Sequence, residues 1–107
     1  MKTADDKINR LLEILQFELT DKEYARLEKR NLNNKYLYVL AMTAESIERL
    51  NINPHTSFTK EQIELCKALG IRLMDESGNF RGAENIIDEI IEATLKIARP
   101  ENGELIR

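Results

Sequence analysis

The sequence has very few of the side chains from which nucleophilic and metal-binding sites are built. Cys66 is its only cysteine and His55 its only histidine. A single cysteine excludes an internal disulfide and favours a reducing compartment, so we expect a cytoplasmic protein. A nucleophile needs a neighbouring base, and zinc needs clustered Cys or His ligands, but the sequence brings neither together. We therefore expect no enzymatic activity, no cofactor and no metal site.

Long hydrophobic runs and a strong net charge are missing too. No run approaches the roughly 18 apolar residues of a membrane-spanning helix, and the charged N-terminus lacks the core of a signal peptide. The formal net charge is -3, with the acidic excess in residues 54–107. This charge provides no long-range attraction to nucleic acid or to an anionic membrane.

Glycine and proline are scarce, with four and two residues, which favours long helices over sheet. A chain of 107 residues can bury enough surface for a core without disulfides or metals. Apolar residues recur at helical spacing in five stretches. These stretches are 4–18, 20–30, 35–50, 59–69 and 83–99. We predict an all-α fold, a compact bundle of about five helices in a single domain at residues 1–100, with a flexible tail at 101–107.

Two helix starts carry the capping-box pattern, in which Ser or Thr stands three residues before Glu or Gln. These pairs are Thr20 with Glu23 and Thr59 with Gln62. Gly70 is a natural left-handed cap for the end of the helix at 59–69. The following residues, 71–82, predict either a short hairpin or an irregular excursion around a turn.

The segment 83–99 organises the predicted bundle. Its apolar residues cover roughly 200° of the helix circumference, against roughly 100° for an ordinary surface helix. Such a helix either lies at the centre of the bundle or also meets a second subunit. Because four short helices would cover this arc poorly, we expect self-association into a homodimer.

The segment 35–50 is expected to bury Tyr36 on its core face and to expose Glu45 on its solvated face. Tyr38 and Met42 of the same segment point towards the solvated side. Ile91 and Leu95 widen the apolar arc of the last helix. Aromatic, methionine and other large apolar side chains supply much of the binding energy at protein interfaces. The predicted protein-binding residues are Tyr38, Met42, Ile91 and Leu95.

With no credible reactive site, we expect a small helical protein-interaction module. Such a module binds and masks a partner protein as an inhibitor, immunity factor, adaptor or assembly factor. The sequence leaves the identity of the partner open.

The alternative is a nucleic-acid-binding regulator. Residues 59–71 resemble the first helix and turn of helix-turn-helix domains. The next residues depart from that family, because Asp75, Glu76 and Gly78 stand where a recognition helix should follow. Acidic residues there would repel the phosphate backbone that supplies most of the affinity. The alternative therefore depends on this degenerate segment or on a basic patch at Lys22, Arg26, Lys29, Arg30 and Lys35.

A second resemblance covers residues 69–81, Leu-Gly-Ile-Arg-Leu-Met-Asp-Glu-Ser-Gly-Asn-Phe-Arg. Together with the Ile86-Ile87 helix that follows, this stretch is similar to a segment recurring in phage tail tape-measure proteins, which are long helical rods. The resemblance implies a phage or mobile-element origin.

Overall fold

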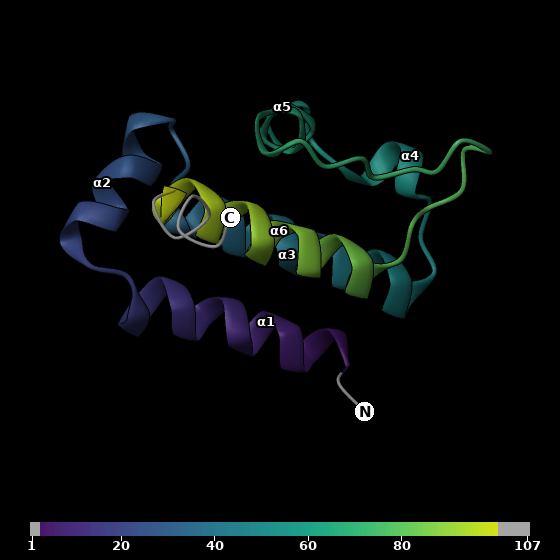
Figure 1. The fold of residues 1–107 in the computed structure, drawn as a ribbon. Helices are drawn as coiled ribbons and strands as arrows, with labels where there is room; N and C mark the ends of the chain where they lie inside the picture. The colour runs from purple at the N-terminus through teal and green to yellow at the C-terminus, as the bar shows by residue number, and fades with distance from the viewer. Residues whose placement is uncertain (1–2, 101–107) are drawn as a thin grey trace.

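The computed structural model describes residues 3–100, which fold as an all-α bundle, as predicted (Figure 1). The tail predicted at 101–107 lies outside the described residues. The elements are α1 (Ala4–Glu13), a π-helical turn η1 (Ile14–Glu18), α2 (Asp21–Lys29), α3 (Asn34–Leu50), α4 (Pro54–Ser57), α5 (Lys60–Leu69) and α6 (Ala83–Ala98). The short helix α4 lies between the predicted helical stretches 35–50 and 59–69 and was not predicted. None of the helices within residues 3–100 is long and apolar enough to cross a membrane.

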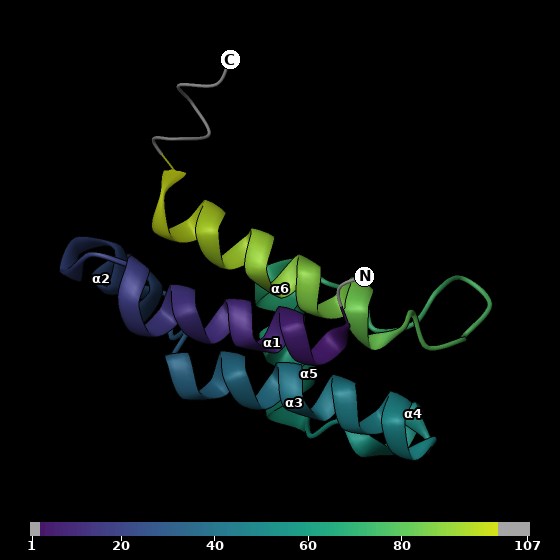
Figure 2. The same ribbon diagram turned by 90° about the horizontal axis from the view of Figure 1, so that it is seen from below.

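Three long helices, α1, α3 and α6, lie side by side and form the core (Figure 2). Helix α6 contacts α1, α2, α3 and α5, and its isoleucines Ile86, Ile87 and Ile90 are fully buried. Its wide apolar arc is therefore covered within one chain. This position makes α6 the central helix of the bundle, and the homodimer loses the observation that motivated it.

Both ends of α6 are capped by side chains from other helices. Its N-terminal residue follows Gly82, which has φ +92° and offers no side-chain cap. The carboxylate of Glu48 on α3 instead accepts a hydrogen bond from the Ala83 N–H at 3.0 Å. At the other end, Arg26 of α2 donates to the Ala98 carbonyl at 2.7 Å. An acid at the positive end and a base at the negative end also match the helix dipole.

The two predicted capping boxes are confirmed. The N–H groups of Glu23 and Gln62 donate to the hydroxyls of Thr20 and Thr59 at 3.2 and 3.1 Å, respectively. Gly70 ends α5 in the left-handed conformation, with φ +75°. A third capping box, between Thr3 and Asp6, was not predicted because its reciprocal acceptor is Asp instead of Glu or Gln.

Residues 71–82 form a hairpin-like excursion, which decides between the two predicted alternatives. A single antiparallel bridge joins Met74 to Phe80, and the Arg81 N–H donates to the Leu73 carbonyl at 3.0 Å. The Asp75 carboxylate closes the turn by accepting from the N–H groups of Ser77 and Asn79. The recognition helix required by the helix-turn-helix likeness is therefore replaced by this hairpin.

The exposure of two residues of α3 differs from the prediction. Tyr36 is 59% exposed, whereas Glu45 is only 8% exposed and bonds its carboxylate to Arg49. The core face of α3 instead includes Ala41, because α1 and α6 both pack against this helix. Phe17, in the first predicted helical stretch, is 80% exposed in the π-helical turn.

Candidate functional site

The predicted protein-binding residues contribute mainly to packing. Tyr38, Met42, Ile91 and Leu95 are all half-buried and pack against the core. The expectation that Tyr38 and Met42 lie exposed is therefore wrong. The large apolar side chains that solvent reaches most freely lie elsewhere, at Phe17, Tyr36, Val39, Leu50, Ile52 and Ile63.

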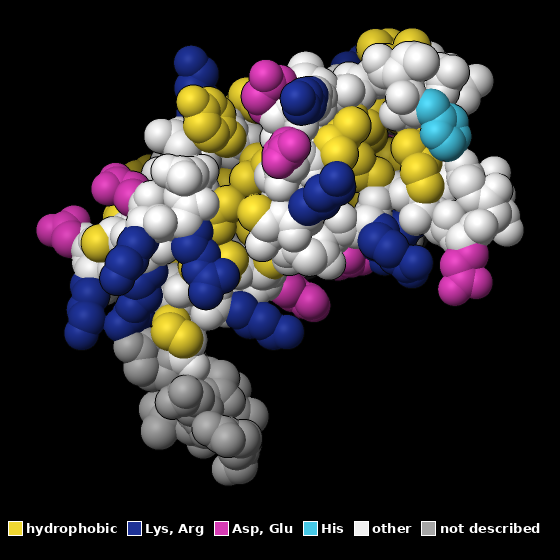
Figure 3. Space-filling view, turned by 90° about the horizontal axis from the view of Figure 1, so that it is seen from above, with side chains coloured by type: hydrophobic (Ala, Val, Ile, Leu, Met, Phe, Trp, Pro, Cys, Tyr) yellow, Lys and Arg dark blue, Asp and Glu magenta, His cyan; other side chains and the backbone are white. Residues whose placement is uncertain are grey.

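An apolar groove opens on the opposite side of the molecule from α1. It is a cavity of about 400 Å³ between α4, α5 and the first arm of the hairpin, residues 71–74. In the view onto this face, hydrophobic side chains gather beside the histidine (Figure 3). The lining residues are Pro54, His55, Phe58, Ile63, Cys66, Lys67, Ile71, Arg72, Leu73 and Met74.

Local sequence signals place the walls of this apolar groove. Pro54 occupies the first turn of α4, and the Gly70 turn directs the chain from α5 into the hairpin. Two contacts then hold the hairpin against α4. The rings of Phe58 and Phe80 lie 6.3 Å apart, and His55 Nε2 donates to the Gly78 carbonyl at 3.0 Å.

Cys66 and His55 both line the groove, which raises the question of nucleophilic catalysis. No hydrogen bond joins the two side chains, and the His55 Nε2 is used on Gly78. Cys66 is 2% exposed, and burial raises the pKa of its thiol to about 11. At neutral pH the thiol is therefore protonated, whereas the thiolate is the reactive form. In this geometry Cys66 behaves as a small buried apolar side chain.

A second depression, which we call the basic hollow, adjoins the groove at the end of α5. Its volume is about 410 Å³, and Lys67 and Ile71 line both cavities. Its charged side chains come from three helices, with an apolar floor between them. The lining residues are Arg30, Lys67, Ala68, Leu69, Gly70, Ile71, Glu89, Glu92, Ala93, Lys96 and Ile97.

The structure divides the predicted basic patch. Lys22 and Lys29 on α2 and Arg30 at its C-cap are exposed, whereas Arg26 is half-buried and caps α6. Lys35 lines a separate cavity between η1 and α3. Sequence reasoning missed the contribution of other helices to the basic hollow, namely Lys67 of α5 and Lys96 of α6. Basic side chains also gather around the α2 end of the molecule (Figure 3).

The carboxylates of α6 that face solvent are partly used in ion pairs. Asp88 pairs with Lys7 of α1, and Glu89 pairs with Arg81 of the hairpin. The Glu89 carboxylate also raises the pKa of the Arg81 guanidinium by hydrogen bonding. Within residues 3–100, no group of three or more His, Cys, Asp or Glu side chains could hold a metal ion.

The apolar groove thus combines apolar walls with basic side chains beside them. Its exposed apolar residue Ile63 was not among the predicted protein-binding residues. Comparisons with protein-family models, curated proteins and solved structures find no match for this chain.

Proposed function

We propose that this protein is a helical interaction module that binds a partner protein through the apolar groove. The observation that carries this proposal is an open cavity of about 400 Å³ whose walls are largely apolar. Cavities of this size and lining accept apolar anchors from a ligand or a protein. The partner would be met in the reducing cytoplasm, where the single cysteine stays a free thiol.

The exposed side chains support protein binding better than catalysis. Ile63 is 40% exposed at the groove, so much of its apolar surface contacts water. Removing that surface from water is energetically favourable. A partner that covers Ile63, Leu73 and Met74 would gain binding energy from their removal from water. The protein would then act by masking the surface of its partner, as an inhibitor, adaptor or assembly factor does.

The proposal is tested with three baits in a nuclease-treated lysate of the native host. The baits are the unmodified protein, Ile63→Asp in the groove and Val39→Asp on α3. Val39 is a matched control because it is 42% exposed, as Ile63 is 40% exposed, and it does not line the groove. We expect proteins retained by the unmodified chain and by Val39→Asp to be lost with Ile63→Asp. Identical retention by all three baits, or no retention at all, overturns the proposal.

A second candidate function is nucleic-acid binding through the basic side chains of α2 and the basic hollow. The observation in its favour is that Arg30, Lys67 and Lys96 converge from three helices. Binding through several phosphates should weaken steeply between about 50 and 200 mM salt. Fluorescence anisotropy with labelled duplex and single-stranded DNA tests this candidate. A lack of binding at low salt, or equal binding by the Lys22→Glu/Lys29→Glu variant, contradicts it.

A further inference from the structure

On the basis of the proposed function, we infer that the partner presents an amphipathic segment whose apolar side chains are flanked by carboxylates. The apolar side chains would enter the apolar groove, and the carboxylates would lie over the basic residues beside it and over the basic hollow. The argument depends on the lining of the two cavities and on which of their charges are already paired.

The shape and lining of the groove favour aliphatic side chains on the partner. Ile63 is exposed, and Leu73 and Met74 are half-buried, so the partner can reach all three side chains. They come from two segments, α5 and the hairpin, which form opposite walls of one cavity. A helix laid in such a groove presents apolar residues at positions i, i+3 or i+4, and i+7.

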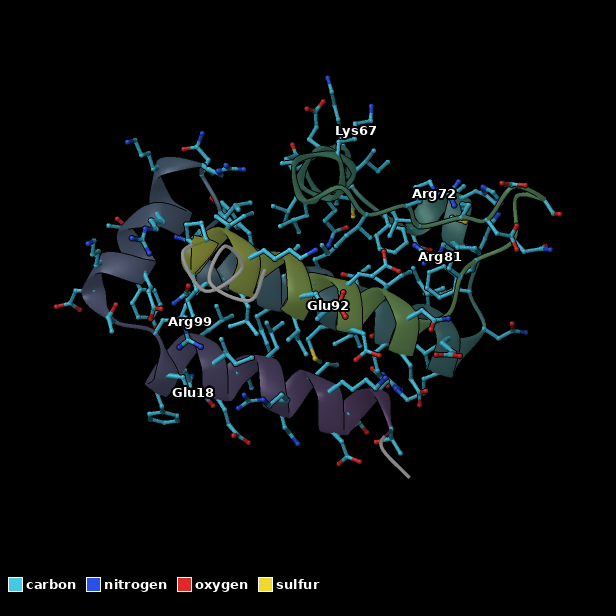
Figure 4. The ribbon with its side chains drawn as sticks, in the orientation of Figure 1. Glu18, Lys67, Arg72, Arg81, Glu92 and Arg99 are labelled. Carbon is cyan, nitrogen blue, oxygen red and sulfur yellow. The ribbon has the colours of Figure 1, made fainter. Side chains whose placement is uncertain are left out.

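The basic side chains that line the groove favour a partner with acidic side chains. Lys67 and Arg72 stand beside the apolar walls on the layer formed by α5 and the hairpin (Figure 4). Neither side chain makes an ion pair within the part of the chain that the structure describes. No Asp or Glu lines the groove, although the whole chain carries a net charge of -3. Carboxylates on the partner would complete both cations with charge-assisted hydrogen bonds.

The basic hollow extends the same preference beyond the end of α5. Lys67 and Ile71 belong to both cavities, and the hollow adds Arg30 and Lys96. Glu89 is already neutralised by Arg81, which leaves Glu92 as the acidic side chain there without an ion pair among residues 3–100. The hollow therefore offers a net positive surface in line with the groove.

A polypeptide fits this combined surface better than a nucleic acid. Single-stranded nucleic acid binds by stacking its bases on aromatic side chains along a basic track. The accessible apolar walls of this groove are aliphatic at Ile63, Leu73 and Met74, and the ring of Phe58 is buried. The one exposed aromatic ring in the lining, His55, is held on the Gly78 carbonyl, so the groove offers no track of rings on which successive bases could stack. A second copy of this chain is the alternative polypeptide occupant. Its exposed Phe17 would supply the apolar side chain and the nearby Glu13 the carboxylate.

The experiment uses the full chain and two fluorescent peptides of about 16 residues with identical leucines at helical spacing. One peptide carries Glu at its polar positions, and the other carries Lys. We expect saturable binding of the acidic peptide at low salt and affinity for the basic peptide lower by about tenfold or more. Lys67→Glu/Arg72→Glu and, separately, Ile63→Asp should each weaken the acidic peptide about tenfold. Lys22→Glu/Lys29→Glu changes the net charge equally on α2, away from the groove, and should change the affinity less than about twofold.

Four results overturn this inference. These are equal affinity for both peptides, no saturable binding of the acidic peptide, an equal loss in the α2 control variant, and displacement of the peptide by single-stranded DNA. Dissociation of a dimer of this chain by the peptide, measured by light scattering, would likewise overturn it by assigning the groove to a second copy. Circular dichroism of each variant excludes unfolding as the cause of lost binding. If the lysate experiment retains a groove-dependent protein but the peptides do not discriminate, the partner chemistry fails while the proposed function stands.

Discussion

Thr94 is a polar side chain in the middle of the apolar face of α6. It is fully buried, and its hydroxyl has no hydrogen-bond partner in the described part of the chain. Replacing this hydroxyl with a methyl group of similar size removes an uncompensated polar atom from the core. We expect Thr94→Val to raise the free energy of unfolding by about 1 kcal/mol, as measured by urea denaturation.

The matched control for this prediction is Thr94→Ser, which keeps the hydroxyl and deletes the methyl group. This variant should destabilise the protein by about 1 kcal/mol, because a buried methyl group is lost. A destabilising Thr94→Val would contradict the prediction and mean that a buried water satisfies the hydroxyl.

Glu23 makes the stability of the fold depend on pH. The N–H of Thr20 holds the pKa of this carboxyl below its ordinary value of 4.5, and Arg99 of the α6 end lowers it further. A carboxylate with a lowered folded pKa stabilises the fold above its unfolded pKa, and this contribution is lost as the pH falls through the folded value. The stability of the protein should therefore decline on acidification below about pH 4.5.

Glu23→Gln keeps the shape of the capping group and removes its charge, so it should cost roughly 1 kcal/mol at pH 7. The difference from the unmodified protein should shrink as the pH is lowered below 4.5 towards about 3, because the unmodified carboxylate is then protonated as well. Urea denaturation at pH 7 and at about pH 3 measures this difference. Glu28→Gln, at an exposed position of α2, removes the same charge without removing a capping contact and is the control at pH 7.

At the scale of single elements, α6 depends on a cap that lies 35 residues away in sequence. Glu48 accepts from the Ala83 N–H, which otherwise would have no acceptor at the start of the helix. We expect Glu48→Ala to lower the free energy of unfolding by about 1 kcal/mol, the usual cost of losing an N-cap. Thermal and urea denaturation measure this cost.

Glu84→Ala tests whether this loss reflects capping or general electrostatics. Glu84 lies exposed in the first turn of the same helix, so it acts on the helix dipole without capping an N–H group. Its replacement should cost no more than about 0.5 kcal/mol. Equal losses in the two variants would assign the effect of Glu48 to charge alone.

The difference between local contacts and contacts with distant helices explains which features could be predicted from the sequence. The caps at Thr20, Thr59 and Gly70 act on backbone groups within a few residues, so sequence spacing determines them. The Glu48 cap depends on how α3 and α6 pack, and no local pattern encodes it. The apolar groove was missed for this reason, because α4, α5 and the hairpin make it only after they have come together. The π-helical turn that exposes Phe17 was not predicted from the sequence either.

The exposure of α3 shows the limit of helical periodicity. A single stripe predicted Tyr36 inside and Glu45 outside, but α3 contacts both α1 and α6, and its buried face is shifted accordingly. The long aliphatic stem of Glu45 tolerates burial because its carboxylate still reaches Arg49. Periodicity thus predicted that the helix is amphipathic, while its neighbours decide which borderline residues are buried.

At the scale of the whole molecule, the bundle has a tightly packed part and a more weakly attached layer. Helices α1, α3 and α6 pack on one another, whereas α4, α5 and the hairpin meet them mainly through α3 and α6 (Figure 1). Few large side chains of this layer are buried, chiefly Phe58, Leu69 and Ile71. Regions with fewer buried contacts open locally at a lower free energy than the core.

Native-state hydrogen exchange should reveal this difference. We expect amides of α5 to exchange through an opening of lower free energy than amides of α6 between Ile86 and Thr94, because the layer can detach while the three-helix core stays folded. Ile71→Ala should widen the gap, since it removes a buried contact of the layer without touching the centre of α6. Equal protection of α5 and α6 would show instead that the molecule unfolds as one unit.

Since the groove lies in this layer, a groove-binding partner should stabilise α5 selectively, and protection confined to α6 on binding would place the interaction elsewhere.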